Sequence, residues 1–63
     1  MKVFSPGERV KLDSELLYYS ANKHWIGKRG TVMEVLDCSH VLVKWDHLVK
    51  TMVNDIGFIE RAY

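Results

Sequence analysis

Alternation of polar and apolar residues predicts the first and third of five short β-strands. Residues 9–12 follow the turn signal of residues 5–7 and read polar, apolar, polar, apolar, the period of a strand with one wet and one buried face. Further along, branched or aromatic side chains stand at every second position, which is typical of a strand. Val41, Val43 and Trp45 are therefore predicted to point inward.

Three other segments complete the predicted strands, at residues 32–36, 49–53 and 58–61. The polar connection at 37–40 is short enough to join its flanking strands as an antiparallel hairpin. Residues 54–57 have a polar start and a glycine end, which predicts a single tight 3-10 turn before the last strand.

Residues 13–22 have a different character and predict a short helix inserted after the first strand. Asp13 or Ser14 can cap its start, Glu15 suits the positive first turn, and Asn22 can end it in the left-handed conformation. Its apolar residues are distributed around nearly the whole circumference of the predicted helix, so we expect the segment to cover one open end of a sheet.

Five short strands are too few for a two-sheet sandwich of normal size, and an open sheet would expose edges that invite aggregation. A small, strongly bent antiparallel barrel avoids both problems. Gly27 and Gly30 can supply the bends or positive φ that closure needs. The sequence therefore predicts a mainly β, five-stranded barrel as one domain over residues 1–63.

Length and composition limit the classes of function. With 63 residues, 48% of them hydrophobic and 27% charged, the chain has enough apolar mass for a core and is not a disordered tail. A domain of this size is expected to have roughly 3 to 9 kcal/mol of stability. It has little room for a core and a separate active site, which argues against a multi-step enzyme.

Charge and cysteine content predict a cytoplasmic protein that does not associate with membranes. The formal net charge is only +1, so any binding to nucleic acid must come from local clustering of cations. Cys38 is the only cysteine, which fits a reducing compartment. The first seven residues contain no apolar signal region, and no apolar run is long enough to cross a bilayer.

One segment, residues 22–30, is locally basic and contains no carboxylate. Its cations can neutralise phosphates, and its indole can stack on an unpaired base. The alternative is that Trp25 and Ile26 pack into the core while the cations are solvated. The candidate nucleic-acid-binding residues are Lys23, His24, Trp25, Lys28 and Arg29.

A second candidate site consists of the adjacent Tyr18 and Tyr19. Aromatic side chains at the rim of a small barrel can line a groove that holds a peptide. Packing within the core or the helical insertion is the alternative use of these two rings.

Metal binding and catalysis have weaker sequence support. The side chains of Cys38 and His40 can reach one metal ion, but a structural zinc site needs a second pair of ligands at similar spacing. Asp46 and His47 are adjacent in sequence, but this does not make them a catalytic pair, since neighbouring strand residues point to opposite faces. We therefore expect no metal, no cofactor, no catalytic residues and no enzymatic activity.

Four short motifs together resemble the SH3-like small barrels of the KOW and Mind-bomb type, and the likeness spans nearly the whole chain. They lie at residues 6–12, 27–32, 41–46 and 58–60. The layout is also similar to that of small proteins encoded by tailed phages and prophages. The insertion between Leu12 and Gly27 departs from the KOW unit, which joins those parts by a short loop.

The resemblance implies an SH3-like barrel that binds RNA, DNA, a ribosomal surface, a peptide or another protein. Our leading hypothesis is a phage-type binding module that associates with nucleic acid, or with a nucleic-acid machine of the host, through its basic loop. The alternative is an adaptor that binds a peptide, a host protein or a phage protein through its aromatic rim. A third alternative is a homo-oligomeric assembly protein that pairs through its edge strands.

Overall fold

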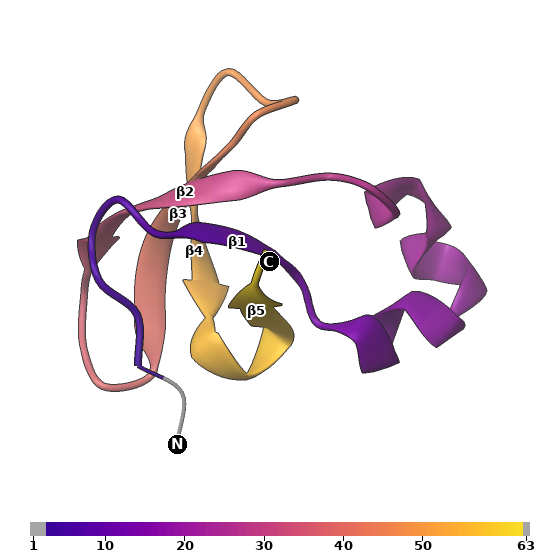
Figure 1. The fold of residues 1–63 in the computed structure, drawn as a ribbon, viewed down its shortest axis with the longest axis horizontal. Helices are drawn as coiled ribbons and strands as arrows, with labels where there is room; N and C mark the ends of the chain where they lie inside the picture. Colours follow the sequence, from indigo (N-terminus) through magenta and orange to yellow (C-terminus); the bar gives the residue numbers. More distant parts are fainter. Residues whose placement is uncertain (1–2, 63) are drawn as a thin grey trace.

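The computed structural model describes residues 3–62, with residues 20–22 described by their backbone only. This part of the chain forms five strands and three short 3-10 helices (Figure 1). In chain order the elements are β1 (Arg9–Leu12), η1 (Ser14–Tyr18), η2 (Ser20–Trp25), β2 (Gly30–Val35), β3 (His40–Trp45), β4 (Thr51–Asp55), η3 (Ile56–Phe58) and β5 (Ile59–Arg61). Over these residues, no helix has the length and apolar character needed to traverse a bilayer.

The strands form one antiparallel sheet in the order β4-β3-β2-β1-β5. The prediction of a mainly β fold with five antiparallel strands is confirmed. The outer strands β4 and β5 are joined through η3, but they do not pair with each other, so the sheet is not closed. Between β1 and β2 the chain leaves the sheet, and η1 and η2 project to one side of it (Figure 1).

The β2–β3 hairpin is the predicted one, with Val32 opposite Val43 on the inward face. A register shift between Val32 and Glu34 leaves Met33 as an extra residue, and such a bulge bends its strand. The sequence began this strand at residue 32, but β2 already begins at Gly30. A Cβ atom at Gly30 would lie 2.8 Å from Cγ1 of Val43, so glycine permits the close approach of β2 to β3.

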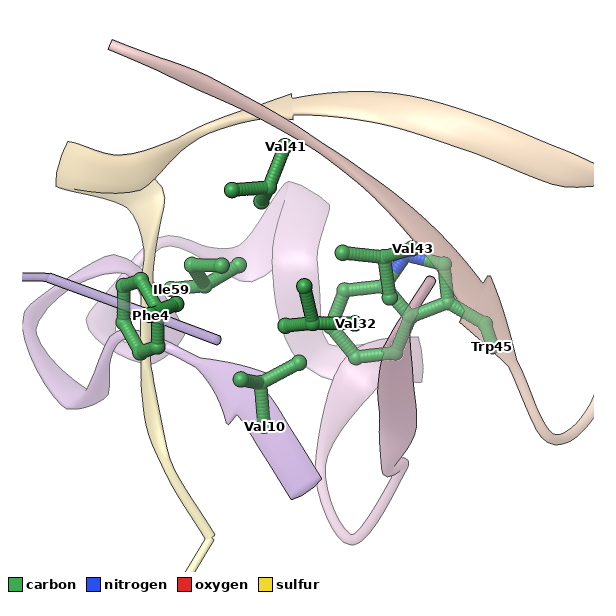
Figure 2. Close-up of a cluster of buried hydrophobic side chains, with 7 residues drawn as sticks. All are labelled: Phe4, Val10, Val32, Val41, Val43, Trp45 and Ile59. Carbon is green, nitrogen blue, oxygen red and sulfur yellow. The ribbon is translucent and has the colours of Figure 1, made fainter. Parts of the chain in front are cut away.

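Seven apolar side chains from the N-terminal segment and four strands converge on one core, which Figure 2 shows in close-up. The predicted inward positions in β3 are confirmed, since Val41, Val43 and Trp45 are all buried. Trp45 is the largest of the fully buried side chains, and its indole N–H donates to Oδ1 of Asn54 at 3.2 Å. The core consists of Phe4, Val10, Val32, Val41, Val43, Trp45 and Ile59.

The helical insertion, defined here as residues 14–25, differs from the single short helix that the sequence predicted. Asp13 does cap η1, because its side chain accepts from the Glu15 N–H at 3.0 Å. An extended Tyr19 (φ −81°, ψ 130°) then separates η1 from η2. The helical turns do not end at Asn22 but continue to Trp25. Because the apolar residues follow no single stripe, a continuous helix would have no one face to bury.

The predicted tight turn before the last strand is confirmed as η3. The Gly57 N–H donates to Oδ1 of Asp55 at 2.8 Å, which caps the turn. The preceding strand, β4, extends to Asp55, whereas the sequence ended it at residue 53. The extension occurs because Asn54 pairs with Val41 and Asp55 pairs with His40 across the sheet.

Candidate nucleic-acid interface

The cationic loop, defined as residues 23–30, leads from the end of η2 into β2. Its tip is a type II turn in which the Lys28 N–H donates to the Trp25 carbonyl at 3.1 Å. Ile26 has φ −61° and ψ 127°, and Gly27 has φ +78°. The third position of this turn needs a positive φ, which explains the glycine there. The turn leaves the side chains of Lys23 and Lys28 exposed and that of Arg29 half-exposed.

The cations of this loop differ from those of β1 and β5 in having no acidic partner. Arg9, Lys11 and Arg61 ion-pair with carboxylates of other elements. Within residues 3–62, no carboxylate lies within ion-pairing distance of Lys23, Lys28 or Arg29. Strands β1 and β5 therefore carry ion-paired cations, and the ammonium of Lys44 in β3 donates to the backbone carbonyls of Trp45 and Leu48, whereas the loop presents its positive charge to solvent.

A cluster of aromatic rings holds the base of the loop. The Trp25 ring lies 4.9 Å from that of Trp45, in an edge-on arrangement. It also contacts His24, with 5.5 Å between ring centroids, and His47, with 5.1 Å. Trp25 is partly buried and packs against the core. The indole thus anchors the loop to the sheet, while His24 and Ile26 remain exposed.

His47 is part of this cluster, although sequence reasoning did not connect it with the basic segment. It lies 22 residues beyond Trp25 and reaches it through the connection between β3 and β4. The Asp46 N–H donates to the Arg29 carbonyl at 2.9 Å, which joins this connection to the cationic loop. No local sequence signal pairs these two segments, because their contact depends on sheet register.

The carboxylate of Asp46 forms an ion pair with Arg9 of β1. Both of its oxygens accept from the Arg9 guanidinium, with Oδ1 at 2.9 Å from Nη1. This hydrogen bonding lowers the pKa of Asp46 and raises that of Arg9. A negative charge next to the backbone of Arg29 is thereby compensated, which favours approach of an anion to the loop.

Tyr18 and Tyr19 are both exposed, at the junction of η1 and η2. The neighbouring apolar groove has a volume of about 270 Å³, and neither tyrosine lines it. Sequence reasoning missed Asn54 as a lining residue, because it had placed this residue in a turn. The groove is lined by Leu12, Leu16, Trp25, Asn54 and Phe58.

Cys38, in the turn between β2 and β3, and His40, the first residue of β3, are the two residues considered for metal binding. Nδ1 of His40 lies 3.0 Å from Oδ1 of Asp37, so this ring nitrogen faces a carboxylate and not the exposed Cys38. A hydrogen bond from the Ser39 backbone N–H lowers the pKa of Asp37, and a hydrogen bond with the His40 side chain lowers it further. Over the described part of the chain, no three His, Cys, Asp or Glu side chains are grouped to hold a metal ion.

Lys23, Lys28 and Arg29 thus lie on one loop, which packs against the core through the Trp25 ring. Comparison of the chain with protein-family models, with curated proteins and with solved structures yields no match.

Proposed function

We propose that this protein is a small, non-catalytic binding module that associates with nucleic acid, alone or within a nucleic-acid machine, through its cationic loop. The observation that carries the proposal is the contrast between cations: Arg9, Lys11 and Arg61 in β1 and β5 are ion-paired, and the three cations of the loop are not. Unpaired cations can contact phosphates without first breaking an internal ion pair, and they release counterions from the nucleic acid when they do.

The architecture supports an SH3-like barrel as the finer description of the fold. This proposal requires the observed strand order and connections. The connection after β1 is long, those after β2 and β3 are short, and a 3-10 turn precedes β5. We retain with it the resemblance to KOW-type barrels and to small phage or prophage proteins. In that setting the module acts in the cytoplasm of a bacterial host.

Each part of the loop has a distinct role in this proposal. Lys23, Lys28 and Arg29 contact phosphates, and the exposed His24 follows Lys23 in the loop. Trp25 holds the loop in position through its contact with Trp45. Because the cations are exposed or half-exposed, their contribution is electrostatic and depends on salt.

Salt titration provides the first test. Three phosphate contacts predict a slope of log affinity against log salt of about −2 for a single strand and about −3 for a duplex. Affinity for a labelled oligonucleotide should therefore fall by about twentyfold or more between about 50 and 200 mM salt. Fluorescence anisotropy at several salt concentrations measures the slope, and a slope near zero would contradict the proposal.

A charge-reversal pair separates the loop from a general charge effect. Lys28→Glu and Lys50→Glu change the net charge by the same amount, but only Lys28 lies in the cationic loop. We expect Lys28→Glu to lower the affinity more than tenfold and to flatten the salt slope by about one phosphate contact. Equal losses in both variants would show that binding follows net charge and not the loop.

A peptide- or protein-binding adaptor is the second candidate, favoured by the apolar groove between the helical insertion and η3. Aromatic and aliphatic side chains line this groove around one polar group, Asn54, as in many peptide sites. Peptide binding in this groove should respond little to salt and should be lost in the variant Phe58→Ala. The Phe58 side chain is exposed and can therefore contact a ligand. Tyr18→Ala tests whether the exposed tyrosines extend the groove.

A further inference from the structure

The two exposed tyrosines of the helical insertion have a different environment from the tryptophans. Tyr18 is 88% exposed and Tyr19 is 62% exposed. By contrast, Trp45 is completely buried, and the Trp25 ring is engaged by Trp45 and His47. Large aromatic rings are usually buried for their apolar area. The faces of Tyr18 and Tyr19 are therefore the aromatic surface that this region offers to a ligand.

Along the chain, Tyr18 and Tyr19 precede Lys23, the nearest of the cations without an acidic partner, by five and four residues. Tyr19 immediately precedes η2, and Lys23 lies four residues further along it. At about 2 Å of rise per residue in a 3-10 helix, the two residues are about 8 Å apart along the axis. This span corresponds to about two nucleotides of a stacked strand, at about 3.4 Å each. A phosphate held at Lys23 would thus place neighbouring bases within reach of the tyrosines.

The charge of the segment favours the same occupant. From Leu16 to Met33 the chain contains no Asp or Glu, and the flanking acids are Glu15 and Glu34. Lys23, Lys28 and Arg29 have no acidic partner here, as shown above. Exposed rings within an acid-free, cationic segment are the combination by which proteins bind single strands without reading sequence.

From this juxtaposition we infer that the ligand of the cationic loop is single-stranded nucleic acid, whose bases stack on Tyr18 and Tyr19 while its phosphates contact the loop. The inference rests on the proposed function and specifies its substrate class. In a duplex the faces of the bases are covered by their neighbours, so the tyrosine rings would gain no stacking contact. Only unpaired bases use both features of the segment.

The test compares one labelled strand of about sixteen nucleotides, the upper site size for a small barrel, alone and annealed to its complement. Anisotropy at low salt should show at least tenfold tighter binding of the single strand. Tyr18→Ala and Tyr19→Ala should each weaken that binding by roughly five- to 150-fold, the fold-change for one stacked base. Tyr18→Phe, which keeps the ring and removes the hydroxyl, should stay within about twofold of the original protein.

Equal or tighter binding of the duplex would overturn the inference. So would wild-type affinity in the two alanine variants, or a loss in Tyr18→Phe as large as in Tyr18→Ala. Val49→Ala, an exposed apolar residue outside the helical insertion, is the matched control and should bind normally. All variants should keep the wild-type urea midpoint, because the substituted side chains are exposed.

Failure of the inference is distinguishable from failure of the proposed function. If Lys28→Glu weakens binding and the tyrosine variants do not, the cationic loop is a nucleic-acid site without base stacking. If neither strand nor duplex binds at low salt, both the proposed function and the inference are wrong. Capture of a peptide or protein partner that depends on Tyr18, with no binding of the strand, would assign the surface to the adaptor function.

Discussion

Trp45 of the β2–β3 hairpin and the two tyrosines of the helical insertion are aromatic residues in opposite environments. In the hairpin, Trp45 is fully buried among valines, and its N–H is satisfied by Asn54. In the insertion, Tyr18 and Tyr19 present their rings to solvent. The hairpin aromatic stabilises the fold, whereas the two tyrosines of the insertion contribute little to it. The comparison separates residues needed for folding from residues available for recognition, and substitutions can test it.

The largest expected effect is at Trp45. Trp45→Ala removes the largest core side chain and should lower the free energy of unfolding by about 3 to 5 kcal/mol. This loss is comparable to the whole stability of a domain of this size. Urea denaturation followed by circular dichroism measures it. A loss below about 1 kcal/mol would show that the core does not depend on this indole.

A smaller loss is expected at Gly30, where β2 and β3 approach each other closely. Gly30→Ala puts a Cβ atom 2.8 Å from Val43 and should cost about 1 to 3 kcal/mol through overpacking. Gly27 offers a matched contrast, because it has open space around it but a φ of +78°. Asparagine tolerates that conformation, so Gly27→Asn should be mild and Gly30→Asn severe. Similar losses at the two positions would contradict this distinction.

The hydrogen bond from the Trp45 indole to Asn54 gives the next effect. Asn54→Ala leaves the N–H without its acceptor and should cost about 1 to 3 kcal/mol. Asn54→Asp keeps an oxygen acceptor and should be less destabilising. Urea midpoints rank the two variants. If both unfold like the original protein, the indole N–H does not need this partner.

Acid should weaken the molecule through the exposed ion pair between β1 and the β3–β4 connection. The pKa of Asp46 is lowered by its hydrogen bond from Arg9. A carboxyl group with a depressed folded pKa stabilises the fold above its ordinary pKa of 3.8 and loses this contribution as the pH falls through the folded value. Stability should thus drop below about pH 4, and Asp46→Asn should reduce that drop. An identical acid profile in the variant would exclude this pair as a source, leaving groups such as Asp37, whose pKa is also lowered.

The smallest effect on folding is expected in the helical insertion. Tyr18→Ala should change the free energy of unfolding by no more than about 0.5 kcal/mol, because its side chain is almost fully exposed. The same urea denaturation measures this change. A loss above about 1 kcal/mol would mean that the ring packs on the protein, and it would erase the contrast with Trp45.

The parts of the fold that the sequence predicted correctly are those set by local pattern. Alternation placed β1 and the inward face of β3, and a polar start followed by glycine located η3. The strand ends were less accurate. Gly30 is typical of a loop and Asn54 of a turn, yet both lie in strands because of their partners across the sheet. Local propensity does not contain those pairings.

The candidate site was predictable only in part. The basic character of residues 23–29 is visible in the chain, and so are the adjacent tyrosines. Whether Trp25 is buried, and whether His47 joins it, depends on contacts across the sheet. The helical insertion was predicted in position but not in form, since its apolar residues define no single helical face.

By itself, the amino-acid sequence determined the small β-rich architecture, the inward valines and Trp45, and the location of the basic segment. The tertiary structure alone decided which charged side chains form ion pairs and which aromatic rings are exposed to solvent. Arg9 meets Asp46 across 37 residues, and Lys11 meets Glu60 across 49, because strands β1, β2, β3 and β5 are neighbours in the sheet. Electrostatic and packing interactions act over a few ångströms in space, so distance along the chain does not predict them.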